Sequence, residues 1–166
     1  QFIWLGGRKQ LQKIRIKSVT LLGGAVTLQP AVNDLGVTID GPLTMHDHVQ
    51  KICRSSSYQL RQLRVIRGSL STEACTMLVH AFVSSKLDYC NSLLAGLSDE
   101  LINRLQSVLH SAARLILKKR RFDPVSDDMR KRLHWLPIRQ RIQFKLGLLV
   151  FKSLHGLAPP YLCDMI

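Results

Sequence analysis

The sequence predicts an α+β fold, with short N-terminal strands followed by a mainly α-helical bundle of about five helices. Up to about residue 42, short β-branched or alternating runs are separated by glycine- and proline-containing breaks. From Thr44 onward, apolar residues recur at the spacing of an α-helix, and serine, glycine and proline residues punctuate the periodic runs.

Four short runs in the N-terminal region are predicted to be strands: Phe2–Leu5, Lys13–Lys17, Val19–Leu22 and Leu35–Ile39. Four such strands cannot enclose a core alone, so we expect them to form the edge of a larger sheet. A self-sufficient β-meander is the alternative. An exposed apolar edge around Val37 and Ile39 would favour self-association.

The first predicted helix begins with a capping box of Thr44 and Asp47, and Gly68 ends it as the C′ residue. Its apolar face comprises Val49, Ile52, Cys53, Ser56, Leu60 and Leu63. Ser71 is the predicted N-cap of the next helix. The apolar residues of that helix are Ala74, Leu78, Phe82 and Val83.

Ser98 is predicted to open a third helix, with an apolar face formed by Leu101, Leu105, Val108, Leu109, Ala112 and Ile116. A short helix is expected around Val125–Leu133. A long one follows from Ile138 to Leu154, with Pro137 at its N1 position and Gly156 ending it. Because this last helix is apolar almost all round, we expect it to be the buried centre of the bundle. Pro159-Pro160-Tyr161 would start a further element, and both chain ends are expected to be truncated.

The charge balance favours a polyanionic partner. The chain has 24 Lys plus Arg against 11 Asp plus Glu, a formal net charge of +13. An excess of this size is typical of proteins that bind nucleic acid, and a solvated basic surface is the alternative. The four cysteines are scattered without a C-x-x-C pair, which favours free thiols in a reducing, intracellular compartment. The longest apolar run, Leu146–Phe151, is far too short to span a membrane, so no membrane partner is expected.

The first long helix carries the best candidate binding surface. Its basic residues fall opposite the apolar face, and no acidic residue lies between Gln50 and Leu70. A basic stripe that contains an aromatic side chain suits contact with a phosphate backbone and stacking on bases. A plain solvated helix face is the alternative. The candidate residues are Lys51, Arg54, Tyr58, Arg61 and Arg64.

A second basic element follows the third helix. It consists of Lys118, Lys119, Arg120 and Arg121, with Arg104 and Arg114 on the same side of the helix above it. Contact with phosphates, a nuclear-import signal and a solvated helix end are all open interpretations.

Candidate catalytic and metal-binding constellations are absent from the sequence. His46 and His48 have no acidic or cysteine partner at metal-ligand spacing. The adjacent acids at Asp99-Glu100 and Asp127-Asp128 fit helix starts rather than a two-metal site. Trp135 is predicted to be a buried anchor of a turn, with base stacking as the alternative.

Several blocks, in order along the chain, carry a resemblance to a known family. They are Ile3-Trp4-Leu5-Gly6, Leu35-Gly36-Val37-Thr38-Ile39-Asp40, LVHAFVSSKLDYCNSLLAGL from Leu78, LQSVLHSAARLI from Leu105 and LHWLPIRQRIQFKLGLLVFKSLHGLAPPYL from Leu133. Together they closely resemble the region that follows the polymerase palm in reverse transcriptases of LINE-type (non-LTR) retrotransposons. The aromatic-Ala-Asp-Asp segment that carries that family's metal-binding aspartates does not occur in the 166 residues.

The resemblance implies three parts. Residues 1–42 would be palm-edge strands, with Leu35 and Gly36 in a primer-grip-like segment. Residues 43–122 would be thumb-like helices, and 123–166 a C-terminal helical segment.

The implied function is binding of an RNA/DNA template–primer duplex, as a fragment of an RNA-directed DNA polymerase. The parent polymerase would use Mg²⁺ and would supply the palm and fingers as partners. This chain is expected to be inactive alone and to hold no cofactor. Its implied location is the nucleus and cytoplasm. A retroelement-derived helical protein-interaction module and a non-functional remnant are the alternatives.

Overall fold

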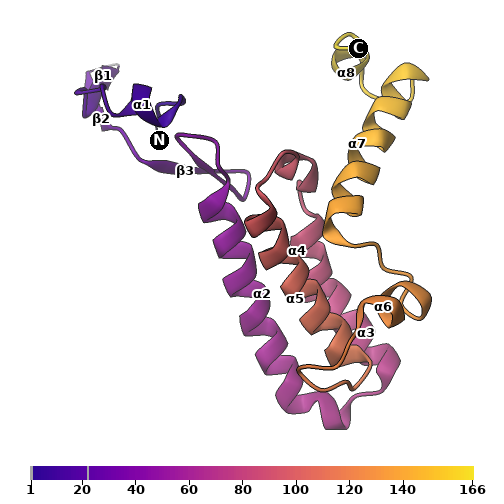
Figure 1. Ribbon diagram of the computed structural model, residues 1–166. Coiled ribbons are helices and arrows are strands. Elements are labelled where there is room, and N and C mark those ends of the chain that lie inside the picture. The colour runs from indigo at the N-terminus through magenta and orange to yellow at the C-terminus, as the bar shows by residue number, and fades with distance from the viewer. Residues whose placement is uncertain (1, 22) are drawn as a thin grey trace. The chain divides into compact units, whose positions relative to one another are not determined.

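The computed structural model describes residues 2–21 and 23–166. It confirms the α+β class: among these residues, short antiparallel strand pairs precede a set of α-helices (Figure 1). The chain divides into two compact units, one reaching to Lys51 and the other running from Ile52 to Ile166. The division predicted at residues 42 and 122 stays a prediction.

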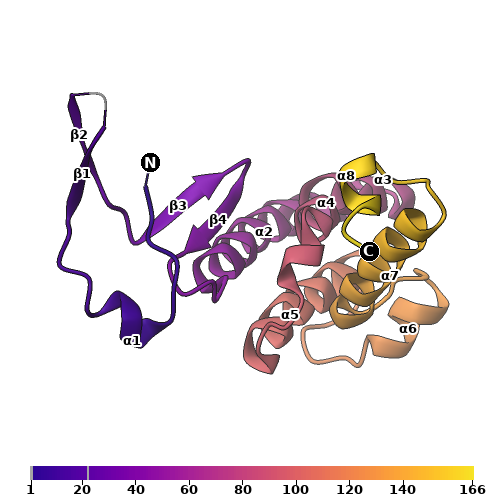
Figure 2. The same cartoon turned by 90° about the horizontal axis from the view of Figure 1, so that it is seen from above.

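The first unit holds two β-hairpins, each a separate two-stranded antiparallel sheet (Figure 2). In the first, Ser18 pairs with Thr27, and in the second, Ala31 pairs with Asp40. The elements of this unit are α1 (Arg8–Leu11), β1 (Ser18–Leu21), β2 (Gly24–Thr27), β3 (Ala31–Asp34) and β4 (Val37–Asp40).

Two of the four predicted strands overlap observed strands, and the other two are wrong. Phe2–Leu5 is no strand, since Phe2 makes an isolated bridge to Leu28. Lys13–Lys17 forms no strand, although its sequence alternates. Val19–Leu22 overlaps β1, with Leu22 outside the described residues. Alternation of apolar and polar residues is a property of one segment. A sheet also requires the backbone of a second segment at hydrogen-bonding distance, and the alternation does not indicate where that segment lies.

The β3–β4 hairpin closes through Leu35 and Gly36. Asp34 pairs with Val37, and the two residues between them have φ of 45° and 87°. Positive φ at both turn positions is typical of a type I′ hairpin, which explains the glycine. The strand predicted from Leu35 therefore begins at Val37. The apolar edge predicted at Val37 is also wrong, because this side chain is 4% exposed.

Asp40 organises the start of the long helix α2 (His46–Ile66). Its carboxylate accepts hydrogen bonds from the backbone N–H groups of Thr44 (3.1 Å) and Met45 (2.7 Å). Burial raises the pKa of Asp40, but the hydrogen bonds that it accepts outweigh burial and leave the pKa below its usual value. The capping box predicted for Thr44 and Asp47 is wrong, because the helix begins later, at His46.

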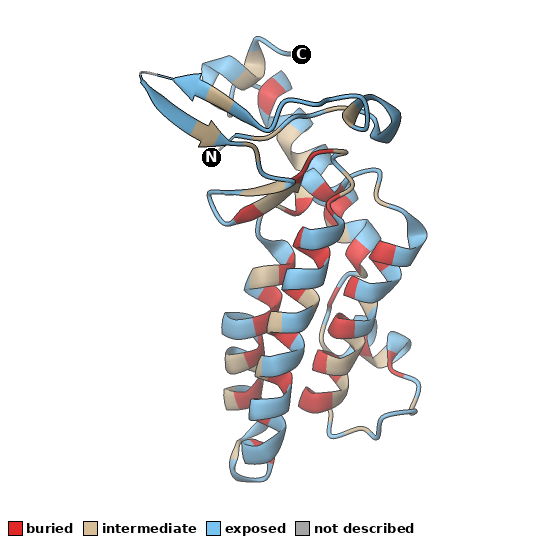
Figure 3. Cartoon of the chain, turned by 90° about the vertical axis from the view of Figure 1, so that its left-hand side faces the viewer, coloured by how far each residue is buried: buried red, intermediate tan, exposed pale blue. Residues whose placement is uncertain are grey.

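The second unit begins within α2 and is helical. Its buried helix faces lie toward one another and form the core (Figure 3). Its further elements are η1 (Arg67–Ser69), α3 (Thr72–Val79), the π-helical turn η2 (His80–Ser84), α4 (Ser85–Asp88), η3 (Asn91–Leu94), α5 (Asp99–Ile116), α6 (Ser126–Lys131), α7 (Ile138–Leu154) and α8 (Pro160–Cys163).

Helical periodicity correctly predicted the buried faces of α2 and α5. The predicted core residues of both helices are buried, with Cys53 half-buried. Ser71 caps α3 as predicted, since its Oγ accepts a hydrogen bond from the N–H of Ala74. Gly68 is not a C′ residue, because it lies inside η1.

The apolar face predicted for the second helix is partly wrong. The side chain of Phe82 is 42% exposed, and the residues that reach the core are Cys75, Val79, Val83 and Leu87. The predicted face is off by one residue already within α3, where Cys75 and Val79 are buried rather than Ala74 and Leu78. The π-helical turn η2 then follows, and Val83 and Leu87 continue the buried face.

Helix α7 is not the buried centre of the bundle. Its bounds match the prediction, but its described buried residues are Ile138, Ile142 and Ser153. Pro137 is the N-cap rather than N1, whereas Gly156 ends the helix as predicted, with φ of 66°. The exposed apolar residues of α7 are Phe144, Leu146, Val150, Phe151 and Leu154. No helix within the described chain is long and apolar enough to cross a bilayer.

Candidate nucleic-acid interface

The outer face of α2 displays the predicted basic stripe. Arg54, Arg61 and Arg64 are exposed, and Tyr58 between them is 53% exposed. None of the ion pairs found among the described residues involves these three arginines. Lys51 lies on the same helix, is also exposed, and is the last residue of the first unit. We call Arg54, Tyr58, Arg61 and Arg64 the α2 face.

Arg67, just after α2, is a buried cation that holds the end of α5. Its guanidinium donates to the carbonyl oxygens of Leu115 and Ile116, both at 2.9 Å, and to that of Leu70 at 2.8 Å. The last carbonyls of a helix lack intrahelical partners and carry partial negative charge. Arg67 therefore joins the end of α2 to the C-terminus of α5 and satisfies these buried acceptors.

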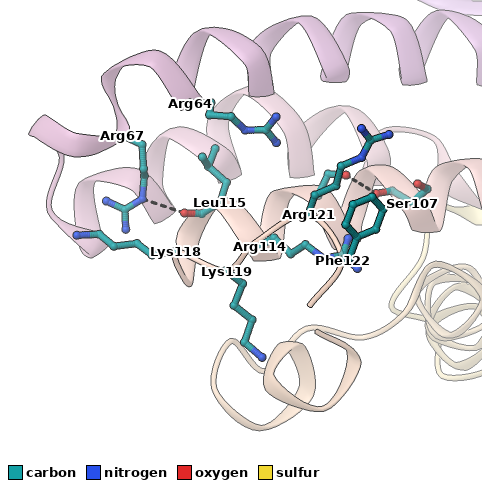
Figure 4. Close-up of a pocket in the computed structure, with 10 residues that line it drawn as sticks. Arg64, Arg67, Ser107, Arg114, Leu115, Lys118, Lys119, Arg121 and Phe122 are labelled. Carbon is teal, nitrogen blue, oxygen red and sulfur yellow. Dashed lines mark hydrogen bonds between the residues drawn. The ribbon is translucent and has the colours of Figure 1, made fainter. Parts of the chain in front are cut away.

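A groove of about 660 Å³ lies beside this junction (Figure 4). Arg64 reaches it from α2, whereas Arg121 and Phe122 reach it from the loop after α5. Within the described part of the chain, no acidic residue lines it. The groove is lined by Arg64, Arg67, Ser107, Ser111, Arg114, Leu115, Lys118, Lys119, Arg121 and Phe122.

Two groove cations are held by the loop that follows α5. The Nε of Arg114 donates to the carbonyl oxygen of Asp123 at 3.0 Å. The Nζ of Lys119 donates to the carbonyl oxygen of Pro124 at 2.7 Å and also pairs with the carboxylate of Asp128. The hydrogen bond from Lys119 holds the pKa of Asp128 below its usual value, against a smaller opposing effect of burial. These two side chains fold the loop back on α5, in addition to lining the groove.

The remaining residues of the second basic element are arranged differently. Lys118 is exposed at φ of 53°, where the helix has ended. Arg120 is exposed and its backbone N–H donates to the carboxylate of Asp123. The guanidinium of Arg121 lies over the ring of Phe122, 5.4 Å from its centroid.

Neither Arg104 nor the predicted primer-grip-like pair, Leu35 and Gly36, is among the residues that line the groove. Arg104 makes an ion pair with Glu100 one helical turn away, at 2.8 Å. Leu35, whose side chain is 85% exposed, and Gly36 form the hairpin tip of the first unit. Of the predicted site residues, the groove brings together Arg64, Arg114, Lys118, Lys119 and Arg121.

A polar contact between α5 and α7 fixes the state of His110. The side-chain oxygen of Gln106 accepts from the N–H of Ile138 at 2.9 Å, so its amide nitrogen faces His110 Nε2 at 2.8 Å. The imidazole must then be neutral at Nε2 to accept this hydrogen bond. Burial, aided by the nearby charge of Arg114, lowers the pKa of His110.

Trp135 is a buried anchor, as predicted, and is not available as a base-stacking platform. Its side chain is 6% exposed, and its ring meets His80 edge to face at 5.4 Å between centroids. Across residues 2–21 and 23–166, no three His, Cys, Asp or Glu side chains are close enough together to hold a metal ion.

Sequence reasoning missed Arg67, Ser107, Ser111, Leu115 and Phe122 as groove residues. The hydrogen bonds from Arg67 to Leu115 and Ile116 link residues 48 and 49 positions apart, and no local pattern signals such a pairing. Phe122 carried a usable signal, since it is an aromatic residue directly after four consecutive basic ones. The chain matches no protein-family model, no curated protein and no solved structure.

Proposed function

We propose that the chain binds a nucleic-acid duplex, as the thumb-like part of a LINE-type reverse transcriptase. In this proposal the α2 face follows the phosphate backbone of an RNA/DNA template–primer, and Leu35 and Gly36 belong to a primer-grip-like segment. The palm and fingers of the parent polymerase, with Mg²⁺ and the catalytic aspartates, lie outside this chain. The family assignment rests on the sequence resemblance alone.

The observation that supports duplex binding is that the three arginines of the α2 face are exposed and take part in none of the ion pairs found among the described residues. A duplex presents a regular row of phosphates, and exposed arginines along one helix face match such a row without first having to break ion pairs. Tyr58 adds an aromatic surface within the same face. Because backbone contacts carry no sequence information, binding should show little sequence preference.

The test is the salt dependence of binding to an RNA–DNA hybrid. Each phosphate contact contributes a slope of about 0.9 to the plot of log affinity against log salt, so replacing Arg54, Arg61 and Arg64 by Gln should reduce the slope by about 2.7. These residues are exposed, so the helical circular dichroism of the variant should equal that of the parent. An unchanged slope in a folded variant would contradict the proposal.

The apolar surface of α7 supports the second candidate, a protein-interaction module. A helix that exposes this many large apolar side chains is typical of a surface that contacts protein. In this second proposal, the self-association that the sequence predicts at the sheet edge occurs through α7 instead, because Val37 is buried and the apolar residues of α7 are exposed. Replacing Phe144 and Leu154, which are 63% and 65% exposed, by Ser should shift sedimentation toward the monomer if α7 mediates it. An unchanged oligomeric state would remove this candidate surface.

A further inference from the structure

The groove beside α5 differs from the α2 face in shape. Its volume of about 660 Å³ lies in the range of small-molecule pockets, which suits a few nucleotides of one strand rather than a whole duplex. Ser107 and Ser111 stand on one wall, and Leu115 adds an apolar surface. The groove therefore combines positive charge, hydroxyl groups and apolar surface within a confined space.

Phe122 gives the groove an aromatic platform with no structural task in the core. Its side chain is 88% exposed, the highest exposure among the large hydrophobic residues that the structure describes. Arg121 lies over the ring, and Arg64 reaches the same groove from α2. A positively charged groove with an exposed aromatic ring is typical of proteins that bind single strands, because every base has a face that can stack.

We infer that this groove binds a single-stranded nucleic-acid segment, with Phe122 stacking on an unpaired base and the exposed cations Arg64, Lys118 and Arg121 contacting the phosphates. The inference rests on the proposed nucleic-acid function but assigns a different strand form to a different surface. Arg64 lines both surfaces and is left unchanged in the test.

The experiment compares two single strands of equal length, of about 12 nucleotides, one of thymidine and one abasic. Both carry the same phosphates, so the difference between their affinities isolates the contribution of the bases. Phe122→Ala should weaken binding of the thymidine strand by about five- to 150-fold, with an unchanged salt slope, because no phosphate contact is lost. The same change should leave binding of the abasic strand and of a blunt RNA–DNA hybrid unaltered.

Phe122→Tyr is the matched control, since it keeps the aromatic ring and should retain the parent affinity for thymidine. Photo-cross-linking of a 4-thiothymidine strand should label the peptide that contains Phe122. Equal affinity of the parent for the thymidine and abasic strands would overturn the inference, and so would a Phe122→Ala variant that binds thymidine as the parent does. Either result leaves duplex binding by the α2 face intact, whereas failure of the hybrid test described above removes the proposed function itself.

Discussion

The arginines of the α2 face and the cations at the end of α5 carry the same charge in different surroundings. Arg54 and Arg61 stand on an open helix face, outside the ion pairs found among the described residues. Arg67, Arg114 and Lys119 donate instead to backbone carbonyls, and Lys119 also pairs with Asp128. The first set is free to take a ligand, whereas the second set is already part of the fold.

This difference separates two roles that a count of positive charges combines. A cation that satisfies buried carbonyls stabilises the folded chain, and its loss should be seen in unfolding. A cation without such partners contributes little to stability, and its loss should be seen in ligand binding. The two regions can therefore be tested against each other with substitutions of the same type.

The largest effect on stability is expected at Arg67. Replacing it by Met removes three hydrogen bonds to carbonyls and should lower the free energy of unfolding by about 2–4 kcal/mol. The matched control is Arg61→Met, an exposed position on the adjoining helix, which should change it by less than about 0.5 kcal/mol. Urea unfolding followed by circular dichroism measures both. Equal values for the two variants would contradict the distinction between the regions.

A smaller effect is expected from the protonation of His110. Its pKa lies below the ordinary 6.5 in the folded chain, so the unfolded chain takes up the proton first. Stability from this site is therefore full above pH 6.5 and is lost as the pH falls through the lower folded value. His110→Leu should make unfolding less dependent on pH in this range. If the free energy of unfolding depended on pH equally in variant and parent, the contact with Gln106 would not require a neutral imidazole at His110.

The smallest effect is expected from the pair of Lys119 and Asp128. The pKa of Asp128 lies below its ordinary value of 3.8 in the folded chain. The contribution of this carboxylate to folding stability is therefore present above pH 3.8 and is lost on further acidification. With Lys119→Met, the free energy of unfolding should fall less steeply as the pH is lowered in the acid range. Lys118→Met, at the exposed neighbouring position, should leave this pH dependence as in the parent. If the free energy of unfolding depended on acid pH in the same way in both variants, the Lys119–Asp128 pair would not stabilise the loop after α5.

Helix periodicity explains which parts of the fold were predictable. The apolar residues of α2 and α5 repeat on one face, and that face is buried in both helices. Helix α7 has apolar residues on every side, so its sequence does not indicate which face is buried. Burial of this helix depends on which other elements are present to cover it. Two of the four predicted strands failed for a related reason, because pairing is a property of two segments and alternation is a property of one.

The candidate site likewise has one part that depends on a single helix and one part that depends on contacts between distant segments. Exposure of Arg54, Tyr58, Arg61 and Arg64 follows from their position opposite the buried face of a single helix, and the structure confirms it. The groove depends on Arg67 reaching the end of α5, a contact between segments distant in the sequence. Local patterns therefore found the helix face and missed half of the groove lining.

The most direct test of the central claim compares two variants of equal net charge. One replaces Arg54, Arg61 and Arg64 by Gln, and the other replaces Arg130, Lys131 and Arg132, exposed residues at the end of α6. If the α2 face contacts the duplex, the first variant should lose about 2.7 from the salt slope for an RNA–DNA hybrid, and the second should keep the slope of the parent. Equal losses in both variants would show that total charge, rather than the α2 face, governs binding, and would contradict the account.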